Sequence, residues 1–214
     1  MNFKPLPSKL WLLWRPGSGY LGYAGFAGLL LLAMVLLPPV RRATEASMTT
    51  HMLVQYPALL LAGALLVGPL PRRWQQGLQR WNELGIAGLL VAALTMALLM
   101  VPRVLDLALV DLRVESVKLL ALGLSGAALM LSWQRAGTVL QAFFLGNVLP
   151  MLAVVGTLYQ DSTTRVCNAY RLDDQQTLGV ALVWVAAGVL VIWLLRLGLT
   201  LWQVDRKLPA RWPQ

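Results

Sequence analysis

The sequence predicts an all-α integral membrane protein, a bundle of about six transmembrane helices with both termini in the cytoplasm. Its 214 residues are 58% hydrophobic and only 13% charged, whereas about a quarter of the residues of a soluble domain are charged. The apolar residues fall in blocks of the length that crosses a hydrocarbon core, about 20 helical residues. We therefore expect a single transmembrane helical domain over residues 1–214, with almost no soluble part.

Six apolar blocks are long enough to span a membrane, and they cover residues 21–40, 51–70, 84–101, 116–133, 137–159 and 177–202. Prolines follow or close the first three, where a residue without an amide donor can end a helix at little cost. The first block has full spanning length and no small-x-small cleavage site close behind it, so we expect a retained helix rather than a signal peptide. Trp11 and Trp14 precede it and suit a membrane interface.

The fourth and sixth blocks are less regular than the others. Residues 103–118 alternate apolar residues with charged ones, among them Asp111, Glu115 and Lys118, so this stretch also fits an amphipathic helix lying at the membrane interface. The sixth block runs on through Arg196, whose long side chain reaches cytoplasmic headgroups if the helix tilts.

The orientation follows from the basic residues. Eleven of the 18 Lys and Arg residues fall on the side that holds the amino terminus, the second and fourth loops and the carboxyl terminus. Seven of the nine acidic residues fall on the other side. The positive-inside rule assigns the first side to the cytoplasm. The net charge of +9 therefore reflects topology, and we expect membrane lipid rather than nucleic acid as the chain's surroundings.

The one histidine of the chain lies in a methionine-rich stretch at the outer mouth of the second block. Met48, His51, Met52 and Gln55 are related by i, i+3, i+4 and i+7 and share one helix face, with Glu45 one turn earlier. Thioether and imidazole ligands together suit copper, above all Cu(I). The simpler alternative is that the methionines fill space and the histidine only anchors a helix start. One histidine cannot complete a closed tetrahedral site, so any metal here is labile or shared.

The longest polar stretch is the outer loop over residues 159–176, which holds the one cysteine, Cys167, and the pair Asp173 and Asp174. A single cysteine excludes an internal disulfide and any CxxC motif, and its simplest role is inert packing. The simplest role of the two carboxylates is to cap the start of the sixth helix. Because both polar stretches fall on the outer side, Cys167, Asp174 or Gln175 can approach the face that carries His51.

Other functional classes find little support. The sequence has no phosphate-binding glycine loop, nucleophile elbow or HExxH motif, so we expect no enzyme. The polar residues that stand out inside the spans are Gln55, Thr95, Gln141 and Asn147, with no chain of carboxylates to relay protons. A transporter is therefore the weakest hypothesis.

The two polar stretches resemble the CtaG family of cytochrome c oxidase assembly factors. The first runs from Ser47 to Gly63 and contains His51-Met52 followed by Pro57 and a leucine-rich run; the second runs from Asp174 to Trp184 and contains Asp174-Gln-Gln with Gly179. Ser47 stands where the family pattern has its first histidine. The resemblance implies a membrane protein that delivers copper to the oxidase.

From the resemblance and the Met/His face we expect a non-enzymatic protein of the bacterial inner membrane that holds or hands over copper at the periplasmic face. The metal ligands would be Met48, His51 and Met52, completed by Asp174 and Cys167. The partner would be a copper enzyme or the subunits of a respiratory complex. The alternative is an accessory transmembrane subunit without metal that stabilises a larger respiratory or monooxygenase complex by helix packing.

Overall fold

The described part of the chain, residues 20–68 and 70–205 of the computed structural model, consists of helices joined by short connections. In chain order these are α2 (Tyr20–Leu36), α3 (Pro38–Glu45), α4 (Met48–Thr50), the π-helical turn η1 (His51–Gln55), α5 (Tyr56–Val67), α6 (Arg72–Trp81), α7 (Ile86–Leu99), α8 (Pro102–Val110), α9 (Leu112–Trp133), α10 (Gly137–Asp161) and α11 (Leu172–Asp205). The predicted interfacial role of Trp11 and Trp14 lies outside the described residues.

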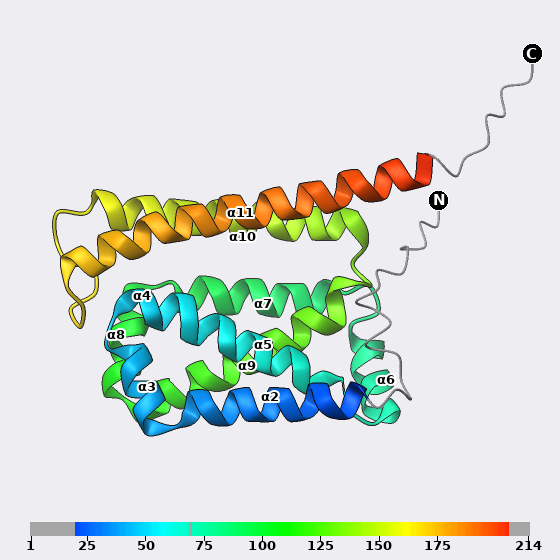
Figure 1. Cartoon of the computed structure of the whole chain (residues 1–214), viewed down its shortest axis with the longest axis horizontal. Helices are drawn as coiled ribbons and strands as arrows, with labels where there is room; N and C mark the ends of the chain where they lie inside the picture. Colours follow the sequence, from blue (N-terminus) through cyan, green and yellow to red (C-terminus); the bar gives the residue numbers. More distant parts are fainter. Residues whose placement is uncertain (1–19, 69, 206–214) are drawn as a thin grey trace, which may run out of the picture.

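The long helices run side by side, with α2, α5, α7 and α9 forming one body and the α10–α11 hairpin lying along it (Figure 1). One end of the bundle, here called the loop end, carries α3, α4, α8 and residues 162–171. The opposite end carries α6 and is called the α6 end; there α2 begins and α11 ends. The described chain therefore starts and finishes at the same end of the bundle.

Among the described residues, four continuous stretches are long and apolar enough to cross a membrane: Met48–Val67, Leu112–Trp133, Gly137–Asp161 and Leu172–Gln203. Two bent pairs meet the same criterion when each is taken as one span, namely α2 with α3, bent by 69°, and α7 with α8, bent by 79°. The prediction of an all-helical bundle with several membrane-crossing helices is thus confirmed, with four to six candidate spans.

Helix boundaries differ from the predicted ones where proline or aspartate interrupts a block. The predicted first span breaks at Leu37, because Pro38 starts a new helix instead of closing the old one. Residues 103–118 do not form one interfacial helix: the chain breaks at Asp111, whose carboxylate accepts a hydrogen bond from the amide of Arg113 at 2.8 Å and caps α9. The last helix begins at Leu172 rather than residue 177.

Close contact between α5 and α9 brings the two sides of the candidate site together. A Cβ at Gly63 would overlap the carbonyl of Gly123, and one at Gly126 would overlap the carbonyl of Leu60. Such small residues let helix backbones in a membrane approach closely. The loop-end start of α9 therefore lies against the helical stretch that carries His51.

A buried charged cluster as the candidate functional site

The predicted Met/His face is buried in the bundle. Met48, His51, Met52 and Gln55 are each at most 4% exposed, and the two methionines belong to the main apolar core. Residues His51–Gln55 form a π-helical turn, with the amide of Tyr56 bonded to the carbonyl of His51. Pro57 follows and has no amide to offer the carbonyl of Leu53, which favours this wider turn at the start of α5.

Both ring nitrogens of His51 are engaged. Its Nδ1 lies 2.6 Å from the hydroxyl of Tyr170 and its Nε2 lies 2.9 Å from Nζ of Lys118. Tyr56 packs against the ring edge-on, with a centroid distance of 5.4 Å. An ammonium group can only donate, so Nε2 accepts from Lys118 and the ring proton resides on Nδ1, which donates to Tyr170. His51 is therefore held neutral in one tautomer.

Lys118 is the centre of the cluster, although only 1% of its surface is exposed. Its Nζ lies 2.8 Å from Oε2 of Glu115, 3.2 Å from Oε1 of Gln55 and 3.7 Å from Oε1 of Glu45, besides the contact with His51. A buried ammonium is tolerated only where such acceptors replace its lost hydration. The surrounding acceptors thus stabilise Lys118 as a buried ammonium.

The formal charges of the cluster alternate in sign. Nε of Arg41 lies 3.7 Å from Oε2 of Glu45, Glu45 approaches Lys118, and Lys118 pairs with Glu115. The amide nitrogen of Gln55 also donates to Oε1 of Glu45 at 3.2 Å. With two cations and two carboxylates, these four side chains have no net formal charge. This balance stabilises charged groups in surroundings where a single unpaired charge would be costly.

Asp174 joins α11 to the start of α4. Its carboxylate accepts hydrogen bonds from the hydroxyls of Ser47 and Thr49 at 2.8 and 2.7 Å, from the amide of Thr49 at 3.3 Å and from the amide of Met48. The prediction that Asp174 caps its own helix is wrong in the choice of partner, because the carboxylate caps α4. Its neighbour Asp173 pairs with Arg171 at the surface.

The loop over residues 162–171 closes the loop end. Asp106 of α8 accepts from the amides of Asn168 and Ala169 at 2.9 and 3.2 Å, and Gln175 accepts from the amide of Val166 at 2.8 Å. Cys167, a residue of this loop, has a buried side chain, with its sulfur 3.9 Å from the carbonyl of Pro102 on α8. Burial, together with the charge of Asp106, raises the pKa of the Cys167 thiol to about 12.

Tyr170 is the residue of this loop that reaches His51. Burial raises the pKa of its phenol, and Glu45 adds to the effect, so the hydroxyl stays neutral and accepts a hydrogen bond from Nδ1 of His51. Tyr170 also lines a pocket of about 400 Å³, together with Ser47, Arg171 and Asp174 among others. Tyr170 therefore contacts His51 of the buried cluster and also borders this pocket.

The structure brings some predicted site residues together and separates others. Met48, His51 and Met52 lie in one buried region, and Asp174 reaches the amide of Met48. The hydrogen bond described for Cys167 goes to α8, and those of Gln175 go to the loop and to the carbonyl of Tyr159 on α10, not to His51. Within the described residues, no group of three or more His, Cys, Asp or Glu side chains is arranged to hold a metal.

The sequence interpretation missed the residues that His51 contacts. The sequence places Lys118 where the charged stretch 103–118 overlaps the fourth predicted span, without a role, whereas the structure places it inside α9, buried with Glu115. The available signal was the i, i+3 spacing of Glu115 and Lys118 at the start of an apolar block, since charged residues inside a span face the bundle interior. Tyr170 carried no signal, because its role depends on how the loop folds.

No protein-family model, curated protein or solved structure matches this chain. Its function must therefore be argued from the cluster itself.

Proposed function

We propose that this chain is an accessory transmembrane subunit without metal that stabilises a larger membrane complex, such as a respiratory or monooxygenase complex, by helix packing. The observation that supports this most directly is the contact between Lys118 Nζ and His51 Nε2 at 2.9 Å. The lone pair that a metal ion needs on this nitrogen is taken by an ammonium group that the chain supplies itself. The cluster then serves to hold α3, η1 and α9 together.

Charge supports the same proposal. Arg41, Glu45, Lys118 and Glu115 already balance, so a bound Cu(I) ion would add one uncompensated positive charge to a buried site. Its entry would also require Lys118 to leave Nε2 and to abandon its acceptors. The four formal charges of the native arrangement are thus balanced by the chain's own side chains.

Copper handling at the outer face is the second candidate. It is favoured by the burial of Met48, His51 and Met52 in one region and by the resemblance to the CtaG family. Asp174 and Cys167 would take part only after the loop end rearranged, because their present contacts go elsewhere. Copper would then be a labile cargo for a copper oxidase, bound when Lys118 swings away.

For either candidate we propose that the loop end faces the periplasm and the α6 end the cytoplasm of a bacterial inner membrane. The assignment is supported by the whole sequence, in which eleven basic residues fall on the side of the α6 end and seven on the side of the loop end, in the sense of the positive-inside rule.

An anaerobic Cu(I) titration against a chromophoric chelator tests the central observation. We expect no chelator-resistant copper on the wild-type chain. In the double variant Lys118→Met with Glu115→Gln, the cation and its carboxylate are both removed and a thioether is added, so we expect one equivalent of Cu(I). That equivalent should disappear when His51→Gln is added. One equivalent on the wild type, lost in Met48→Leu with Met52→Leu, would establish copper handling instead.

A deletion strain tests the accessory role. The gene for this protein is deleted, and the strain is complemented with the wild type or with the double variant Met48→Leu with Met52→Leu. Native electrophoresis measures the abundance of assembled membrane complexes in each strain. We expect one complex to fall on deletion and to recover with both forms, because leucine preserves the packing. Recovery with the wild type alone would favour copper, and an unchanged set of complexes would exclude the accessory role.

A further inference from the structure

The short helix α6 at the end of the bundle is amphipathic. Trp74, Leu78 and Trp81 are spaced i, i+4 and i+7 and lie on one face. Arg73 and Arg80 are also seven residues apart, and at 3.6 residues per turn they lie along one side of that face, about a third of a turn from its centre. Ten residues are too few to cross a membrane.

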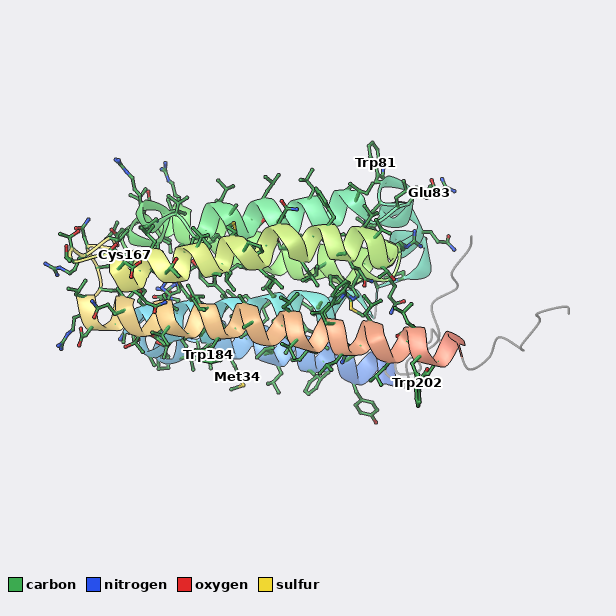
Figure 2. The ribbon with its side chains drawn as sticks, turned by 90° about the horizontal axis from the view of Figure 1, so that it is seen from above. Met34, Trp81, Glu83, Cys167, Trp184 and Trp202 are labelled. Carbon is green, nitrogen blue, oxygen red and sulfur yellow. The ribbon has the colours of Figure 1, made fainter. Side chains whose placement is uncertain are left out.

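None of the described side chains of α6 is covered by the rest of the described chain. Trp81 is 90% exposed, and Trp74, Leu78 and both arginines are also exposed. Figure 1 shows α6 running across the end of the bundle, at a steep angle to α2 and α7, and Figure 2 shows Trp81 pointing away from the ribbon. Within residues 20–68 and 70–205, the apolar face of α6 is thus left without a partner.

The position of α6 is fixed by the residue that follows it. Nδ2 of Asn82 donates to the hydroxyl of Ser132 on α9 at 2.7 Å, and Oδ1 of Asn82 accepts from the amide of Gly88 on α7 at 3.1 Å. Gly85 then takes a left-handed conformation, with φ of 76°, which turns the chain into α7. α6 is therefore tied to the level at which the apolar helices end.

We propose that α6 lies in the headgroup layer of the membrane and binds anionic phospholipids. Trp74, Leu78 and Trp81 insert toward the hydrocarbon, and Arg73 and Arg80 pair with lipid phosphates. The two arginines are about 10 Å apart along the helix, since each residue rises about 1.5 Å, which is enough for two headgroups.

The charge and residue types favour a lipid surface over a soluble partner. Tryptophan prefers the boundary between headgroups and acyl chains, and a helix with aromatic residues on one face and arginines beside that face is typical of interfacial helices on anionic membranes. Trp202 of α11 lies at the same end of the bundle (Figure 2), as expected for an aromatic belt.

A local probe on the apolar face tests the proposal. Leu78→Cys is labelled with bimane in the full chain. The buried Cys167 thiol is expected to stay unlabelled, and the parent chain, treated with the same reagent in parallel, checks this. The labelled chain is placed in bilayers that mix phosphatidylcholine and phosphatidylglycerol. In each of two parallel samples, only one of the two lipids carries a doxyl quencher. We expect quenching by the phosphatidylglycerol probe to exceed that by the phosphatidylcholine probe about fivefold.

The matched variants identify the cause. Arg73→Gln with Arg80→Gln should abolish the preference for phosphatidylglycerol, whereas Arg103→Gln with Arg113→Gln, a change of two exposed arginines at the loop end, should keep it. Equal quenching by the two lipids in the parent chain would overturn the proposal. So would strong quenching by aqueous iodide, which would place α6 in water, or protection from both quenchers, which would place a protein partner on it.

Discussion

Nζ of Lys118 lies 2.9 Å from Nε2 of His51, and this contact joins two helices whose residues are 67 positions apart in the chain. The histidine is positioned by η1, and the lysine by α9, which packs on α5 through glycines. The same ammonium is held by Glu115 and Gln55. The packing of η1 against α9 at this end of the bundle therefore depends on one buried cation.

Removing that cation alone should be costly. Lys118→Met leaves Glu115 buried without its partner, and breaking a buried ion pair in this way costs about 3–5 kcal/mol. The double variant Lys118→Met with Glu115→Gln removes both charges, and we expect it to lose less stability than the single variant. Denaturation by SDS, followed by circular dichroism, measures the free energy of unfolding.

Glu115→Gln alone completes the cycle for this pair. The difference between the double variant and the sum of the singles gives the coupling energy of Lys118 and Glu115. Additive effects would contradict a direct ion pair, whereas strong coupling is expected at a separation of 2.8 Å.

Local periodicity explains why half of this site could be predicted. Met48, His51, Met52 and Gln55 share a face because helical spacing is a property of neighbouring residues, and the structure buries all four. The partners of His51 could not be found this way, because Lys118 and Tyr170 come from distant segments. Pairing across helices depends on how they pack, which spacing within one helix does not encode.

The same limit applies to the fold. Block length and composition predicted an all-helical bundle with several membrane-crossing helices, because the hydrocarbon thickness sets the length of each block. The breaks at Leu37 and Asp111 were not predicted, since proline and aspartate can equally end one helix or begin the next. Only the tertiary contacts decide between these outcomes.

Asp174 should matter more than its neighbour. Asp174→Ala removes an acceptor from two hydroxyls and two amides at the start of α4, and we expect a loss of about 2–3 kcal/mol from a charged cap of this kind. Hydrogen exchange at the amides of Met48 and Thr49 should accelerate. Asp173→Ala is the matched control, because Asp173 pairs only at the surface with Arg171. Equal losses in the two variants would contradict the cap.

Cys167 should react slowly with maleimide in the folded chain. With a pKa of about 12, its thiolate fraction at pH 7 is far below that of a free thiol, whose pKa is about 8.5. We expect labelling in denaturant to be at least about a thousandfold faster than in the folded protein. The folded rate should rise roughly tenfold for each unit between pH 7 and pH 9, because each unit raises the thiolate fraction tenfold.

A variant tests the contribution of Asp106. Asp106→Asn removes the negative charge that helps to raise the pKa of the Cys167 thiol and weakens the acceptor of the Asn168 and Ala169 amides, so labelling should speed up. Asp161→Asn changes an exposed carboxylate at the same end and should leave the rate unchanged. A folded rate within tenfold of the denatured rate would show that the thiol is accessible and ionised.

Two glycines on facing helices should respond oppositely to alanine. A Cβ at Gly63 would overlap the carbonyl of Gly123, so Gly63→Ala must push α5 away from α9 and should cost about 1–3 kcal/mol. A Cβ at Gly123 meets no atom within 4 Å, and alanine is the better helix former by up to about 1 kcal/mol, so Gly123→Ala should be neutral or stabilising. SDS denaturation compares the free energies of unfolding of the two variants.

The glycine contact also positions the buried cluster. Because separation of α5 from α9 pulls His51 away from Lys118, Gly63→Ala should expose the Nε2 of His51, which ¹⁵N NMR of the single histidine can detect as a shift of that resonance. A stabilising Gly63→Ala, with an unchanged histidine resonance, would contradict the backbone contact that holds the cluster together.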